Sequence, residues 1–78
     1  MQESPFYELV MQRGIERGAR ENAIENTLAI LTARFPHADV NALKPALEAI
    51  ADLNRLKELN LTASLAPSFR EFQHGLEP

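Results

Sequence analysis

The first long stretch of the chain, from Ser4 to Phe35, carries the pattern of a single α-helix. Ser4 is a favourable N-cap, and Pro5 suits the first helical turn because its missing N–H would have had no intrahelical partner there. Pro36 cannot continue a helix and marks its end. We therefore expect one long helix that runs up to Phe35.

The second half of this helix carries one apolar stripe. Ile24, Leu28, Leu31 and Phe35 recur at steps of four, three and four residues. This spacing places the four side chains on one face of a helix, as in helices that pack along a seam against a partner. The stripe predicts the contact of the long helix with the rest of the chain.

The first half of the helix has a different pattern. Phe6, Leu9 and Val10 form an apolar patch, and Gly14 and Gly18 follow four residues apart. Each glycine inside a helix costs about 0.5–1 kcal/mol relative to alanine, so two on one ridge require a reason. One interpretation is that the glycines allow the backbone of a second helix to approach closely.

The alternative interpretation is a weakly stable, solvated arm in which the glycines have no role. Two glycines at this spacing are a specific signal only in membranes. The segment also carries five charged side chains, Arg13, Glu16, Arg17, Arg20 and Glu21. The residues alone leave both interpretations open.

Three short helices are expected after Pro36. Asn41 is the predicted N-cap of the first, with Leu47 and Ile50 on its apolar side and its end near Ala51. Asp52 is the predicted N-cap of the next, which is expected to run to Thr62. Their junction has no Gly or Pro, so one continuous, kinked helix is the competing interpretation.

The last short helix has the clearest local signal. Ser68 and Glu71 form a capping box, in which the Ser hydroxyl accepts from the N3 amide and the Glu reaches back. Phe69 and Phe72 then share one face, and Gly75 is placed to end the helix. Residues 61–67 are expected to form the connection that precedes this helix.

These elements predict an all-α fold in which the three short helices pack on the C-terminal half of the long helix. Residues 1–23 would be a projecting arm with the two glycines, and residues 24–78 a small helical domain. The ten predicted core residues are apolar and lie on the inward faces: Ile24, Leu28, Leu31, Phe35, Leu47, Ile50, Leu53, Leu56, Phe69 and Phe72. Assembly as an oligomer is expected, because 78 residues bury a small core and would leave the arm uncovered.

Composition narrows the function classes. The net charge is −3, from 8 basic and 11 acidic side chains, so a strongly basic, DNA-binding face is not expected. The absence of cysteine excludes disulfides and thiolate zinc sites and suits a reducing compartment. The N-terminus lacks a signal-peptide pattern, and no run is long and apolar enough for a membrane span, so we expect a cytoplasmic protein.

Few residues could carry chemistry. His37 lies two residues before Asp39, but no third metal ligand is near in sequence, and His74 is isolated near the C-terminus. No nucleophile has a plausible base partner. We expect no catalytic residue, no metal and no cofactor.

Three motifs resemble the C-terminal region of Rpn-type recombination-promoting nucleases, a family of the PD-(D/E)XK superfamily also described as transposases. They are ESPFY (Glu3 to Tyr7), GIERGARE (Gly14 to Glu21) and LAILTARFP (Leu28 to Pro36). The tail from Leu47 to Leu76 is also similar to the short helices that end the family's chains. The resemblance implies a metal-dependent DNA endonuclease domain upstream, and no residue of the present chain matches the nuclease motif.

The resemblance and the pattern together predict a non-catalytic oligomerisation module. The predicted interface residues lie on the arm: Phe6, Leu9, Val10, Gly14 and Gly18. The expected partner is a second copy of the chain. The resemblance adds the full-length nuclease as a possible partner, because some genes of the family also produce small C-terminal proteins that bind and restrain it. The alternative prediction is a DNA-positioning module that uses four arginines, Arg13, Arg17, Arg20 and Arg34.

Overall fold

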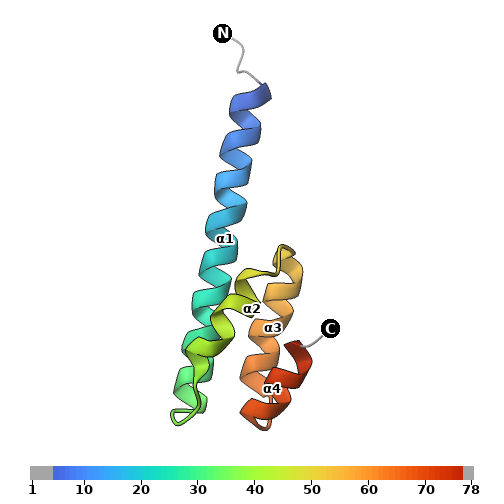
Figure 1. Ribbon diagram of the computed structural model, residues 1–78. Helices are drawn as coiled ribbons and strands as arrows, with labels where there is room; N and C mark the ends of the chain where they lie inside the picture. Colours follow the sequence, from blue (N-terminus) through green and yellow to red (C-terminus); the bar gives the residue numbers. More distant parts are fainter. Residues whose placement is uncertain (1–4, 77–78) are drawn as a thin grey trace.

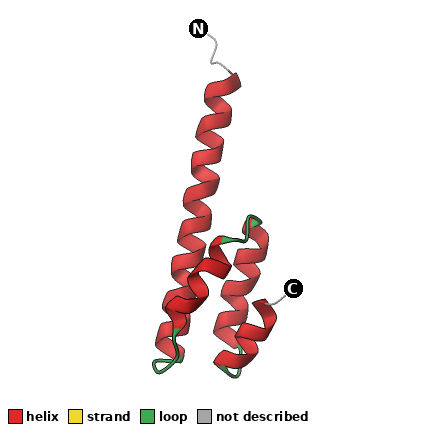
Figure 2. Cartoon of the chain, viewed as in Figure 1, coloured by secondary structure: helices red, strands yellow, loops and turns green. Residues whose placement is uncertain are grey.

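The computed structural model describes the backbone of residues 5–76 and the side chains of residues 8–76. This part of the chain is helical and contains no strand, as the sequence predicts (Figures 1 and 2). Its elements are α1 (Pro5–Arg34), the 3₁₀ helix η1 (Val40–Leu43), α2 (Lys44–Glu48), α3 (Leu53–Leu65) and α4 (Phe69–Leu76). The predicted N-cap Ser4 lies outside the described residues.

α2 and α3 lie beside the C-terminal half of α1, and α4 lies against α3, so the prediction that all three short helices pack on α1 is wrong for α4 (Figure 1). α1 and α3 run side by side in the same direction, because η1 and α2 carry the chain back along α1 before α3 begins (Figure 2). α4 then turns back alongside α3. This arrangement leaves the N-terminal half of α1 projecting beyond the rest of the fold.

The core lies between α1, α2 and α3, with α4 closing its lower end. Of the ten predicted core residues, five are buried: Ile24, Leu31, Leu47, Leu56 and Phe72. The other five are partly buried and pack against this cluster: Leu28, Phe35, Ile50, Leu53 and Phe69. Thr27 is buried on the α1 side, where its hydroxyl donates to the Ala23 carbonyl over 2.9 Å.

The projecting part of α1 makes the molecule long and narrow. The principal extents are 55 × 24 × 19 Å, and the Cα radius of gyration is 15.4 Å. A compact domain of 78 residues would have a radius of gyration of about 11.5 Å. The difference indicates that a single chain leaves much of α1 without tertiary contacts.

The start of the second helix differs from the prediction. Asn41 is not an N-cap, because Val40–Leu43 forms a 3₁₀ turn and α2 begins only at Lys44. Val40 and Leu43 are both buried, and a spacing of three residues places both on the same side of a 3₁₀ helix. α2 also ends earlier than predicted, at Glu48 rather than near Ala51.

α2 and α3 are separate helices, as predicted, and Asp52 is the N-cap of α3. Its carboxylate accepts a hydrogen bond of 2.9 Å from the backbone N–H of Asn54. The predicted end of this helix at Thr62 is wrong, and so is the prediction that residues 61–67 form a connection. The helix continues to Leu65 because Ala63 is fully buried and extends the inward-facing side of α3.

The start of α4 confirms one half of the capping box, since the Glu71 backbone N–H donates to the Ser68 hydroxyl over 3.1 Å. The predicted role of Gly75 is wrong. The described part of the chain has no glycine with positive φ, and Gly75 lies inside α4, which ends at Leu76. The Gly75 carbonyl instead accepts a hydrogen bond of 2.8 Å from the Arg55 guanidinium on α3.

Candidate interaction surface

The N-terminal half of α1 exposes large apolar side chains. Among the described side chains of α1, the first buried one is Ala23, and every side chain from Glu8 to Gly18 is exposed. The exposed fractions are 44% for Leu9, 52% for Val10, 50% for Met11 and 68% for Ile15. Large apolar side chains exposed close together on one helix are a feature of surfaces that another molecule covers.

Both glycines of α1 are open on their outer side. A Cβ atom added at Gly14 or at Gly18 would meet no described atom within 4 Å. Within one chain, therefore, nothing packs against either glycine. The two positions leave the α1 backbone accessible to a neighbouring helix.

Helical geometry separates the predicted interface residues into two groups. Successive residues are about 100° apart around an α-helix, so Val10, Gly14 and Gly18 lie on one side of α1. Leu9 lies on the side that carries the core stripe further down the helix. The side chain of Phe6 lies outside the described ones. The predicted surface is thus only partly a single face.

Met11 and Ile15 lie on the same side as the glycines and were missed by the sequence interpretation. The missed signal is the spacing of Met11, Ile15 and Gly18, which alternates four and three residues as in a packing seam. We call the five residues on this side the arm face: Val10, Met11, Gly14, Ile15 and Gly18. Glu21 and Glu25 follow Gly14 and Gly18 by seven residues each, so two carboxylates continue this side of α1 below the arm face.

The arginines of the arm lie mostly on the core side of α1, and Arg17, seven residues after Val10, borders the arm face. Arg13 and Arg20 follow the side that continues into the core, and Arg17 pairs with Glu21, with 3.2 Å between Nε and Oε1. Both partners of that pair are exposed, so it stabilises the helix little. Arg34 donates to the Ala63 carbonyl over 2.7 Å and lies 4.8 Å from the centre of its neighbour's aromatic ring.

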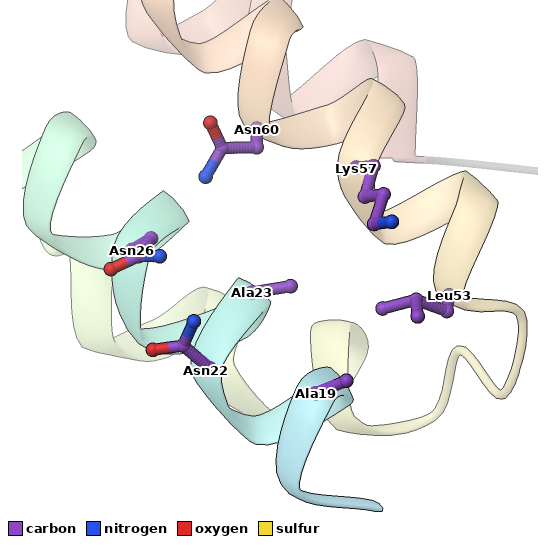
Figure 3. Close-up of a pocket in the computed structure, with 7 residues that line it drawn as sticks. All are labelled: Ala19, Asn22, Ala23, Asn26, Leu53, Lys57 and Asn60. Atoms are coloured by element: carbon purple, nitrogen blue, oxygen red, sulfur yellow. The ribbon is translucent and has the colours of Figure 1, made fainter. Parts of the chain in front are cut away.

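A shallow groove lies between α1 and α3 below the arm (Figure 3). Its volume is about 280 Å³. The lining residues are small, apolar or amide-bearing, with one lysine: Ala19, Asn22, Ala23, Asn26, Leu53, Lys57 and Asn60. The carboxamides and the ammonium can form hydrogen bonds, but the lining contains no carboxylate, thiol or imidazole for acid–base or nucleophilic chemistry.

A second exposed apolar patch lies on the outer side of α3. Leu61 and Leu65 are 61% and 72% exposed and lie one helical turn apart. They line a shallow depression with Pro67 and Glu71. The sequence interpretation assigned Leu61 and Leu65 to a connection, so it missed this patch.

The residues singled out for metal chemistry are not gathered. His37 and Asp39 are both exposed, and His74 lies in the last turn of α4. In residues 5–76 no three side chains of His, Cys, Asp or Glu are placed to hold a metal ion. In the same range, no helix combines the length and the apolar character that crossing a membrane requires.

Comparison with protein-family models, with curated proteins and with solved structures finds no match for this chain.

Proposed function

We propose that this chain is a self-association module whose α1 arms pair with those of a second copy. The observation that supports the proposal most is the arm face, where Met11 and Ile15 are at least half exposed beside two open glycines. An uncovered apolar row on an otherwise charged helix is costly in water and is relieved when another copy covers it.

The exposed area is large enough for a specific interface. The chain exposes 5893 Å², whereas a compact monomer of 8.7 kDa would expose about 4,700 Å². The excess of about 1,200 Å² exceeds the roughly 800 Å² that each partner contributes to a standard protein interface. The excess reflects the elongated shape of the whole chain, and it leaves room for an interface of standard size.

The expected affinity is modest. Fully burying a Val, Ile or Met side chain contributes about 1.5–3 kcal/mol, and roughly half of each is already out of water in the single chain. Association costs an estimated 4–15 kcal/mol in lost translational and rotational freedom. Three such side chains from each of two copies contribute about 5–9 kcal/mol together, so the balance favours a dissociation constant of about 100 μM or weaker.

The resemblance to Rpn-type nucleases suggests what this association is for. In a parent protein, paired arms would bring two nuclease domains together. As a separate chain, the module would pair with the arm of a full-length nuclease and form mixed assemblies. In both cases the module contributes binding rather than catalysis.

Light scattering coupled to size exclusion tests the proposal across a concentration series that extends from micromolar to millimolar. We expect the mass to rise from one to two copies, and Ile15→Glu and Gly14→Leu to keep the chain monomeric. Gln12→Glu is the matched control, since it adds the same charge to the arm on a different side of α1. A folded wild-type monomer at all concentrations, unchanged by Gly14→Leu, would remove the proposal.

The DNA-positioning alternative has less support. Arg34 binds the Ala63 carbonyl, and Arg17 is paired with Glu21. Of the four predicted arginines, Arg13 and Arg20 form no salt bridge with another described side chain, and the chain has a net charge of −3. Duplex binding at low salt that falls steeply as salt is added would favour the alternative, and no binding at low salt would exclude it.

A further inference from the structure

We infer that the two arms pair antiparallel, with a two-fold axis between Gly14 and Ile15 and with Met11 of each copy against Gly18 of the other. This inference rests on the proposed self-association and adds the orientation and the register. It follows from the distribution of large and small residues on the arm face and from the charges that flank it.

Met11 and Gly18 lie at equal distances, three and a half residues, on either side of the midpoint between Gly14 and Ile15. When the second helix is reversed about that midpoint, each Met11 is level with Gly18 of the second copy. Met11 is half exposed, and the outer side of Gly18 is open. A flexible thioether side chain can fill the space that the glycine leaves.

The same axis brings the two Gly14 residues together at the crossing point, where neither backbone carries a side chain on this side. The helices can therefore approach closely there. Ile15 lies at the edge of the arm face, 68% exposed, and meets Ile15 of the second copy beside the axis. Each large residue of the seam thus has either a glycine or another apolar side chain opposite it.

A parallel, in-register pair fits this surface less well. Each residue would face its own copy, so Met11 would face Met11, and no glycine would lie opposite the Met11 side chain. Glu25 lies seven residues after Gly18 and therefore on the same seam. A parallel pair would place two Glu25 carboxylates side by side, which is unfavourable.

The antiparallel pair avoids this repulsion. With the axis between residues 14 and 15, position 5 of one copy is level with position 24 of the other, so the described overlap ends before Glu25. The overlap of 5–24 is about 30 Å long at 1.5 Å per residue. α2 lies beside the lower end of this overlap, where Lys44 and Glu48 line a shallow pocket with Glu21 and Glu25.

A distance measurement between spin labels tests the orientation. Ala33 is exposed on α1 beyond the overlap, and the chain has no cysteine, so Ala33→Cys provides a single labelling site. In the antiparallel pair the two labelled positions are separated along α1 by 37 residues, about 55 Å. In a parallel pair they lie across an interaxial distance of about 8–10 Å, so label-to-label distances stay near 20 Å.

Disulfide trapping tests the register independently. Met11→Cys and Gly18→Cys should cross-link when the two variants are mixed, and neither should cross-link alone. Two cysteines whose Cα atoms are more than about 7 Å apart cannot form a disulfide, and seven residues of helix separate equivalent sites by about 10 Å. Circular dichroism of each variant checks that the helices form.

The outcomes separate the inference from the proposed function. A distance near 55 Å with cross-linking only in the mixture supports the antiparallel pair. Any other defined distance, or cross-linking of Met11→Cys alone, overturns it and leaves self-association intact. Gly14→Cys lies at the axis and cross-links in either orientation. A monomeric mass with no Gly14→Cys cross-link removes both proposals.

Discussion

The guanidinium of Arg34, in the last turn of α1, donates a 2.7 Å hydrogen bond to the carbonyl of Ala63, near the end of α3. The last four carbonyls of a helix have no intrahelical donor, and they carry the negative end of the helix dipole. Arg34 satisfies one of these carbonyls with a charged donor. The contact joins the lower ends of two helices that run in the same direction.

We expect Arg34→Ala to lower the free energy of unfolding by about 1 kcal/mol, because a charged donor to a helix C-terminus is lost from a partly exposed site. For a chain of this size such a loss lowers the melting temperature by about 4–8 °C. Thermal melting by circular dichroism measures it. Arg70→Ala is the matched control, since Arg70 is an exposed arginine on α4. An equal loss in both variants would contradict a specific role for Arg34.

The two faces of α3 should respond very differently to the same substitution. Leu56 is fully buried and Leu61 is 61% exposed, although both lie on α3. Leu56→Ala is expected to cost about 2–5 kcal/mol through lost transfer energy and a cavity. Leu61→Ala should change stability by no more than about 0.5 kcal/mol. Urea unfolding measures the stability of both variants. A large loss of stability in Leu61→Ala would show that a neighbouring molecule covers its patch.

The cap of α4 provides a second matched pair. The Ser68 hydroxyl accepts from the Glu71 backbone N–H over 3.1 Å, so Ser68→Ala removes an N-cap and should cost about 1 kcal/mol. The Ser64 hydroxyl donates back to the Asn60 carbonyl within α3. Ser64→Ala should therefore be nearly neutral, since that carbonyl keeps its helical donor. Equal losses of stability in Ser68→Ala and Ser64→Ala would argue against a capping role for Ser68.

The helical periodicity predicted most of the fold because the apolar stripes of α1 and α3 are regular. Ile24 and Leu31 lie on the apolar stripe of α1, Leu56 lies on that of α3, and all three are buried. Element boundaries were predicted less well where packing overrides local signals. Ala63 is a weak hydrophobic signal in sequence, yet it is fully buried and holds α3 in helical form to Leu65.

The candidate surface was predicted only in part, and the reason is also physical. The sequence interpretation grouped Leu9 with the glycines, since all are apolar or small and near in sequence. The helical step of about 100° places Leu9 on the opposite side of α1 from Met11 and Gly18, and it places Met11 and Ile15 beside the glycines. The spacing of Met11, Ile15 and Gly18 carried this signal, whereas the exposure of Met11 and Ile15 depends on how far the short helices reach along α1.

Gly18→Ala should have opposite effects on the single chain and on the pair. In the single chain an added Cβ meets no described atom within 4 Å, so alanine should stabilise α1 by about 0.5–1 kcal/mol through its higher helix propensity. In the pair the same methyl group would occupy the space assigned to Met11 of the second copy, and association should weaken.

The two effects can be measured on one protein by following helicity at low concentration and mass at high concentration. Ala19→Gly is the reciprocal control, because it removes a methyl group from the adjacent, half-buried position on α1. It should lower helicity by a similar amount without opening the arm face. If Gly18→Ala raised helicity and left the dimer unchanged or tighter, Gly18 would not be a contact, because a methyl group on a packed seam must displace its neighbour.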